Sequence, residues 1–236
     1  GTVSASQNVT YGATPSFAVT PGAGWVVQSV TGCGGSLSGT TYTTGAVTAN
    51  CSVSATFVAI VNGACGSDHG ASTLATPTAA LCTTGTPSGV TTGSSAYDWS
   101  CAGANTGTTA SCTAPRLYAV TASVVSGSGT ISASQNVAYH ATPAFTVTPS
   151  AGWVVQSVSG CGGSLAGSTY TTGAITANCV VAATFVAIVN GACGGDDGAT
   201  LVSTPTQLCS AGSASAVAAG TTAFSWSCAG ANTGTT

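Results

Sequence analysis

Short segments in which apolar and polar residues alternate recur along the whole chain. They include residues 145–148 (Phe-Thr-Val-Thr), residues 180–185 and the run Leu117–Ser126, and glycines such as Gly162 and Gly163 separate them. A period of two residues is typical of half-buried β-strands, whereas glycine clusters mark the turns between them. No segment has the period of an amphipathic helix. The pattern therefore predicts an all-β protein.

The chain repeats itself. Residues 24–30 recur as residues 152–158, an offset of 128 residues (Trp153 against Trp25). Five cysteines recur as well, at offsets of 128 and then 127: Cys33 with Cys161, Cys51 with Cys179, Cys65 with Cys193, Cys82 with Cys209 and Cys101 with Cys228. Only Cys112 has no second copy, and its counterpart would fall at position 239 (112 plus 127), three residues beyond Thr236.

Each period contains two modules, so we expect four small β modules arranged as beads in an extended array. Residues 1–60 form a module that lacks its first strand, because nothing before Gly1 matches the run Leu117–Ser126. Residues 61–116 form a Cys-rich β module and residues 117–188 repeat the first module. Residues 189–236 repeat the Cys-rich module without its last strand.

Composition narrows the possible partners. The chain has one Lys or Arg, four Asp or Glu and a formal net charge of -3, which leaves no basic stripe for nucleic acid. Its longest apolar stretch, residues 180–189, is too short to span a bilayer, so we expect no membrane insertion. Eleven cysteines without metal-type spacing indicate disulfides formed in an oxidising compartment.

The first module resembles the divergent internalin B-type repeat of large bacterial surface proteins. The resemblance rests on motifs spread over residues 129–185, among them Ala151-Gly152-Trp153 and the run from Tyr170 to Ile175. The second module resembles a Cys-rich companion of such repeats through Asn62-Gly-Ala-Cys and Trp99-Ser-Cys. These resemblances imply β-rich modules in a surface protein, and they imply no catalytic residue and no cofactor.

Two disulfides follow from the module boundaries. Cys33 with Cys51, and Cys161 with Cys179, are the only cysteines of their modules, and each pair closes about 19 residues, worth roughly 3 kcal/mol. The four cysteines of the Cys-rich module allow three connectivities, of which Cys65 with Cys82 and Cys101 with Cys112 is slightly favoured. Cys193 and Cys209 would pair likewise, and Cys228 would lack a partner within the chain.

The few Asp and His residues could form a catalytic or metal-binding site, but their positions favour structural roles. Asp98, His140 and His69 each occur in one copy only, which argues against an enzyme with a repeated active site. Asp68 recurs as Asp196, each two residues before a glycine. This pattern is more typical of a turn residue than of a Ca²⁺ site, which needs six to eight ligands.

The tryptophans also have two interpretations. Trp25 and Trp153, and Trp99 and Trp226, are flanked by valines or by serine and cysteine, which favours core positions over a sugar-stacking platform. We therefore predict a structural segment of an extracellular, cell-surface fibre, filament or adhesin stalk. Its partners would be copies of itself or adjacent repeats. The alternative is an adhesin module that binds host or environmental surface glycans.

Overall fold

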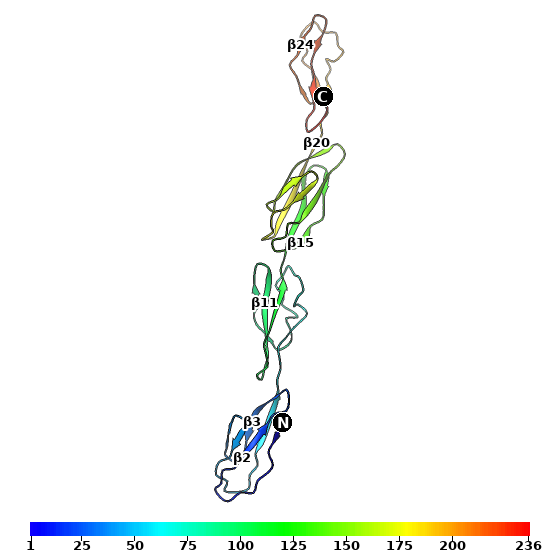
Figure 1. The fold of residues 1–236 in the computed structure, drawn as a ribbon. Helices are drawn as coiled ribbons and strands as arrows, with labels where there is room; N and C mark the ends of the chain where they lie inside the picture. Colours follow the sequence, from blue (N-terminus) through cyan, green and yellow to red (C-terminus); the bar gives the residue numbers. More distant parts are fainter. The chain divides into compact units, whose positions relative to one another are not determined.

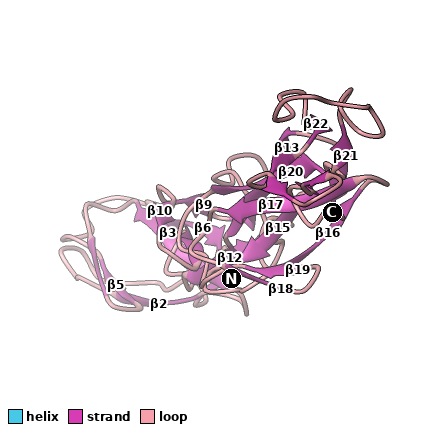
Figure 2. Cartoon of the chain, turned by 90° about the horizontal axis from the view of Figure 1, so that it is seen from above, coloured by secondary structure: helices cyan, strands magenta, loops and turns pink.

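The structure is a computed structural model and describes every residue from 1 to 236. It contains strands, turns and loops and no helix (Figure 2). No helix of the length and apolarity needed to cross a bilayer is present. The chain divides into two compact units, Gly1–Arg116 and Leu117–Thr236. The expected all-β fold of disulfide-stapled modules is confirmed.

The first half of the second unit is built from two four-stranded sheets, one of which contains the strands labelled β15 and β20 in Figure 1. One sheet has the order β15-β13-β20-β17 and the other β14-β16-β19-β18. The strands are β13 (Leu117–Ser126), β14 (Gly129–Ile131), β15 (Gln135–Ala138), β16 (Ala144–Pro149), β17 (Trp153–Ser159), β18 (Ser164–Ala166), β19 (Thr169–Thr171) and β20 (Cys179–Ala187). The predicted strand Leu117–Ser126 is confirmed in full.

The core of this half is formed by inward-facing residues of both sheets. Tyr118 and Val120 of β13 are buried, as are Val181, Ala183 and Phe185 of β20. Alternate residues of a strand point to opposite faces of its sheet, so this spacing places all five side chains on one inner face. They contact buried residues of the second sheet: Phe145, Val147, Tyr170 and the nearby Ile175.

The first half of the first unit has one of these sheets complete and the other reduced to two strands. The complete sheet has the order β1-β2-β5-β4, and the reduced sheet is the pair β3-β6. The strands are β1 (Thr2–Val3), β2 (Ser16–Thr20), β3 (Trp25–Thr31), β4 (Ser36–Ser38), β5 (Thr41–Thr43) and β6 (Ser54–Ala59). Strand β6 corresponds to β20 but has a strand partner on one side only, whereas β20 also pairs with β13.

The Cys-rich half of the first unit contains a sheet of β10-β11-β12, with β9 also paired to β11, and the separate pair β7-β8. The strands are β7 (Ala64–Cys65), β8 (Cys82–Thr84), β9 (Thr86–Pro87), β10 (Thr91–Thr92), β11 (Ala96–Ala102) and β12 (Ala110–Pro115). Tyr97, Trp99 and Ala114 form its small core together with the cysteines, which lie where the two sheets meet.

The Cys-rich half of the second unit consists of three two-stranded pairs, β21-β22, β23-β26 and β24-β25. The strands are β21 (Ala192–Cys193), β22 (Cys209–Ala211), β23 (Ser213–Ala214), β24 (Ala218–Ala219), β25 (Phe224–Ser225) and β26 (Cys228–Ala229). No strand here corresponds to β12.

Candidate functional site

The disulfides of the first-type modules form as predicted. Cys33 bonds Cys51 and Cys161 bonds Cys179, each with a sequence separation of 18 residues. In the second unit the bond joins a turn to the first residue of β20, and both cysteines contact the main core cluster. The bridge therefore ties a surface turn to the longest strand pair of the module.

A glycine-rich turn positions Cys161 for this bond. Gly160, Cys161 and Gly162 all have positive φ angles, of 116°, 49° and 63°. A cysteine in the left-handed region is unusual, and the flanking glycines carry the remaining positive angles without a steric cost. The buried Tyr170 hydroxyl donates a hydrogen bond of 2.6 Å to the Gly160 carbonyl, which holds the turn in place.

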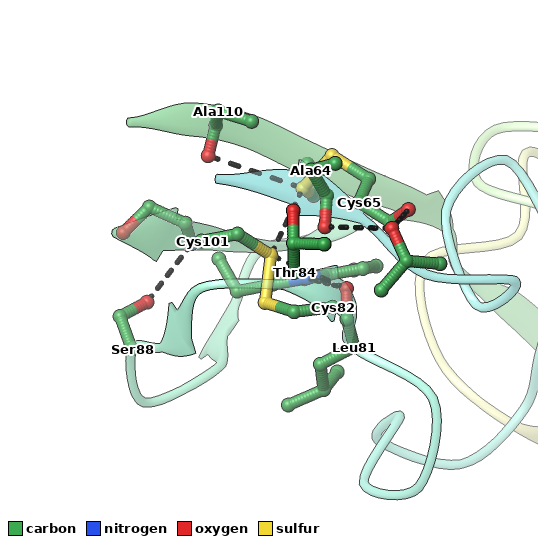
Figure 3. The surroundings of a disulfide bond; sticks show 12 residues. Ala64, Cys65, Leu81, Cys82, Thr84, Ser88, Cys101 and Ala110 are labelled. Atoms are coloured by element: carbon green, nitrogen blue, oxygen red, sulfur yellow. Dashed lines mark hydrogen bonds between the residues drawn. A yellow bond between two sulfur atoms is a disulfide. The ribbon is translucent and has the colours of Figure 1, made fainter. Parts of the chain in front are cut away.

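The connectivity slightly favoured for the Cys-rich module is wrong. Cys65 bonds Cys112, with a sequence separation of 47. Cys82 bonds Cys101, with a separation of 19 (Figure 3). The reason lies in the two sheets: β7 and β8 pair with each other, whereas β11 and β12 belong to the other sheet. Each bridge therefore joins the two sheets instead of neighbouring strands within one sheet.

The prediction for Cys228 is also wrong, for the same reason. Cys228 is buried and bonds Cys209, as Cys101 bonds Cys82 in the first unit. The free and exposed cysteine is Cys193, the counterpart of Cys65. No cysteine among residues 189–236 is the counterpart of Cys112, so the sheet-to-sheet pairing gives Cys193 no partner within these residues.

The sulfur atoms of Cys65, Cys101 and Cys112 lie within 4.8 Å of one another. A metal ion would need thiolates at these positions. All three cysteines are in disulfides, so this cluster offers no thiolate while the bridges are intact. The close sulfurs result from two adjacent bridges at the meeting of the sheets.

The two recurring aspartates act as turn residues. The Asp68 carboxylate accepts a hydrogen bond of 3.0 Å from the Ala80 amide. In the second copy, Asp196 accepts hydrogen bonds of 2.6 Å from the amides of both Thr206 and Gln207. Each carboxylate therefore closes a loop of its Cys-rich half, as expected for aspartate in a turn.

The tryptophans occupy different environments. Trp99 is buried, and its indole nitrogen donates to the Leu81 carbonyl at 2.8 Å. Trp226 makes the same bond to Leu208 at 2.6 Å. Trp153 contacts the core of its module, whereas Trp25 is 47% exposed. The core assignment thus holds fully for Trp99 and fails for Trp25.

The other titratable side chains do not gather at one site. Asp98 lies exposed on β11. The Nδ1 atom of His69 accepts a hydrogen bond of 3.0 Å from the Thr113 amide. His140, in the second unit, stacks on the ring of Tyr139. The contacts of the two histidines are thus with backbone and with an aromatic ring.

Two open grooves lie where one copy has a strand and the other has none. A groove of about 540 Å³ in the first unit is lined by Val9, Phe17, Asn50 and Val53, among others. A groove of about 530 Å³ in the second unit is lined by Asp196, Leu201, Phe224 and Trp226, among others. The first lies beside residues 50–53, which precede β6, and the second lies within the Cys-rich half of the second unit.

Sequence reasoning missed two polar residues that hold β13 in place. The Asn178 side-chain oxygen accepts a hydrogen bond of 2.9 Å from the Ala119 amide, and the Ser134 hydroxyl accepts one of 3.0 Å from the Ala122 amide. Both residues are retained in the other copy, as Asn50 and Ser6. Their identity at the offset of 128 residues is the signal that could have revealed them.

The comparisons with known proteins add no relative. No family model, no curated protein and no solved structure matches the chain.

Proposed function

We propose that the chain is a tension-bearing segment of an extracellular fibre or adhesin stalk on a bacterial surface. The observation that carries this proposal is the bridge between Cys65 and Cys112. Cys65 lies in β7, the first strand of its Cys-rich module, and Cys112 lies in β12, the last one. A pull on the two ends of the module passes through this covalent bond and bypasses the 46 residues between the two cysteines.

Strand geometry in the second unit supports the same role. Strand β13 begins at Leu117, so only Arg116 separates it from the end of β12. It pairs in parallel with β20 from Val120 opposite Cys179 to Ser126 opposite Thr184. Tension applied at the start of β13 and at the end of β20 slides the two strands past each other. The hydrogen bonds between them are then loaded together instead of one at a time.

The free edges and the lack of charge support association between copies. Soluble β proteins commonly protect strand edges with lysine or with inward-pointing charges. This chain has one Lys or Arg in total, Arg116, and four acidic residues. Its partners are proposed to be further copies of these repeats, and its first-type modules are proposed to be internalin B-type repeats.

The disulfides indicate the kind of environment in which the protein resides. Five bridges form within the chain, and such bridges persist in oxidising, extracellular-type environments. A place on the cell surface is part of the proposal and fits a protein that must stay folded outside the cell without help from chaperones.

Single-molecule stretching of the second unit within the whole chain tests the proposal. Handles at residues 117 and 188 load β13 against β20 in shear. Handles at residues 117 and 138 instead separate β13 from β15 one residue pair at a time, because Leu117 lies opposite Ala138. We expect a clearly higher rupture force with the first pair of handles. Equal forces would remove the mechanical basis of the proposal.

A glycan-binding module is the second candidate, favoured by one observation. Trp25 is 47% exposed and Tyr11 is 84% exposed in the first unit, and exposed aromatic rings can stack on sugars. Binding of the intact chain to an array of surface glycans, lost in a Trp25→Ala and Tyr11→Ala double variant, would establish this function. Unchanged binding in that variant would reject these rings as the platform.

A further inference from the structure

The two bridges of the first Cys-rich half lie close enough to each other to exchange partners. Cys65 bonds Cys112 and Cys82 bonds Cys101. The Sγ atoms of Cys101 and Cys112 belong to different bridges, yet they are only 3.7 Å apart. Reacting atoms in a near-attack geometry are about 3–3.5 Å apart. A small shift of either side chain therefore brings a sulfur of one bridge to reacting distance from a sulfur of the other.

Each bridge joins one partly exposed cysteine to one buried cysteine. Cys65 and Cys82 are partly exposed, whereas Cys101 is 0% exposed and Cys112 is 3% exposed. A small thiol from the solvent reaches the partly exposed end of either bridge, and the cysteine that it displaces is then the buried one. In both cases the displaced thiolate is one of the two sulfurs that lie 3.7 Å apart.

The two partly exposed cysteines lie opposite each other as well. Cys65 and Cys82 are partners in the antiparallel pair of β7 and β8. The Cα atoms of directly opposite residues in such a pair are about 4.5–5.5 Å apart, which lies within the range of about 4.4–6.8 Å that is usual for a disulfide. The four cysteines therefore have a second possible pairing, Cys65 with Cys82 and Cys101 with Cys112.

The strand register favours the native bridges when the module is at rest. Cys101 lies opposite Ala110 and Cys112 lies opposite Trp99, so Cys101 and Cys112 are diagonal neighbours on β11 and β12. Diagonal neighbours are about 7–8 Å apart, which is longer than the Cα distance usual for a disulfide. A bond between Cys101 and Cys112 draws the two strands together locally. This distortion makes the second pairing a minor species in the folded chain.

We propose that Cys65 and Cys82 form a thiol-exchange site, at which a small-molecule thiol such as glutathione switches the two bridges to the second pairing. The thiolate of the small molecule attacks the Cys65 Sγ atom, the bond to Cys112 breaks, and Cys112 leaves as a thiolate. Cys112 then attacks the Cys101 Sγ atom, and Cys82 leaves as a thiolate. Finally, Cys82 attacks the Cys65 Sγ atom and displaces the small thiol, so that no net oxidation or reduction occurs. Attack on Cys82 starts the same steps in the mirror order.

The switch lengthens the path that carries tension. The native outer bridge closes a separation of 47 residues, whereas the second pairing closes separations of 17 (82 minus 65) and 11 (112 minus 101). The remaining 19 residues (47 minus 17 minus 11) span about 65 Å when extended, so tension favours the second pairing. This consequence rests on the proposed role under tension. The exchange itself does not, and it can be measured without any load.

Mass mapping of the folded, oxidised Cys193→Ser chain, which lacks the free thiol, tests the exchange. The chain is exposed to glutathione, separated from it in acid, and returned with iodoacetamide to a pH near the usual thiol pKa of about 8.5. Among chains with one glutathione and one alkyl group on these four cysteines, we expect the two groups on Cys65 and Cys82, because exchange moves the thiol to an accessible cysteine. The pairs Cys65 with Cys112 and Cys82 with Cys101 should be about tenfold rarer or more, because the reagent does not reach buried thiols.

Two double variants of the same chain show the result without exchange. With Cys82→Ser and Cys101→Ser only the outer bridge remains, so glutathione on Cys65 leaves the thiol on the buried Cys112. With Cys65→Ser and Cys112→Ser, glutathione on Cys82 leaves the thiol on the buried Cys101. Neither variant should gain an alkyl group before the chain is denatured. The same result in the chain with all four cysteines overturns the proposal, as does the absence of glutathione from Cys65 and Cys82. A bridge from any of the four to a cysteine of another module also overturns it, because it shows exchange in the unfolded chain.

Discussion

The two nested bridges of the first Cys-rich half should behave differently when the chain is stretched. We consider two double variants of the intact, oxidised protein, Cys82→Ser with Cys101→Ser and Cys65→Ser with Cys112→Ser. The inner bridge lies wholly within the loop closed by the outer one, since residues 82 and 101 fall between 65 and 112. Only the outer bridge determines how far this half can extend.

The expected change in length follows from the two sequence separations, 47 and 19, which differ by 28 residues. Loss of the inner bridge releases nothing, because the outer bridge still holds residues 65 and 112 together. Loss of the outer bridge releases those 28 residues, and an extended residue spans about 3.5 Å, so the stretched chain lengthens by about 100 Å.

Force spectroscopy with handles at residues 1 and 236 measures this difference in the contour length after full unfolding. The variant without Cys82 and Cys101 should match the unsubstituted protein. The variant without Cys65 and Cys112 should be about 100 Å longer. An equal gain of this size in both variants would show that Cys65 pairs with Cys82 and Cys101 with Cys112, and would refute the force path through the outer bridge.

Three further predictions concern single residues. Trypsin should cut the native chain very slowly at Arg116, because the Arg116 amide donates to the Ser95 carbonyl at 2.9 Å and the Arg116 side chain donates to the Gly93 carbonyl at 2.9 Å. Rapid cleavage into two fragments, measured by mass spectrometry, would indicate a flexible junction. A maleimide should label one thiol per oxidised chain, at Cys193, and Cys193→Ser should abolish the labelling; a label on Cys228 would contradict the pairing with Cys209. Trp99→Ala should lower the free energy of unfolding of the first unit by about 3–5 kcal/mol, because the Trp99 ring is buried, and Trp25→Ala should lower it by much less, because the Trp25 side chain is half exposed. Equal losses of unfolding free energy in denaturant titrations would refute the assigned burial.

The sequence predicted the strands better than it predicted the cross-links. The alternation within Leu117–Ser126 predicted β13, because Tyr118, Val120 and Ala122 lie on the more buried face and Thr121 and Ser123 are exposed. The pairs Cys33–Cys51 and Cys161–Cys179 followed because no other cysteine lies in those modules.

The pairing in the Cys-rich half depends on which sheets face each other, and spacing along the chain does not contain that information. Cys65 and Cys82 lie directly opposite each other in β7 and β8, which is the proximity that spacing favours. Both nevertheless bond across to β12 and β11. For the same reason the sequence predicted Cys228 as the unpaired cysteine, whereas the unpaired one is Cys193.

The groove beside β6 combines predictable and unpredictable features. The repeat indicated that the first module has no counterpart of Leu117–Ser126. The roles of Asn178 and Ser134 became visible only in the structure, where their side chains accept hydrogen bonds from the amides of β13. Such side-chain acceptors have no local sequence pattern, since their partners lie 12 and 59 residues away along the chain.

Immunogold electron microscopy of cells that carry this protein tests the proposed role most directly. Antibodies would be raised against the folded, oxidised chain, so that they recognise the disulfide-stapled surface. The account predicts gold particles along filaments or stalks outside the cell. Labelling confined to the cell interior, or spread over the surface without any filament, would contradict it.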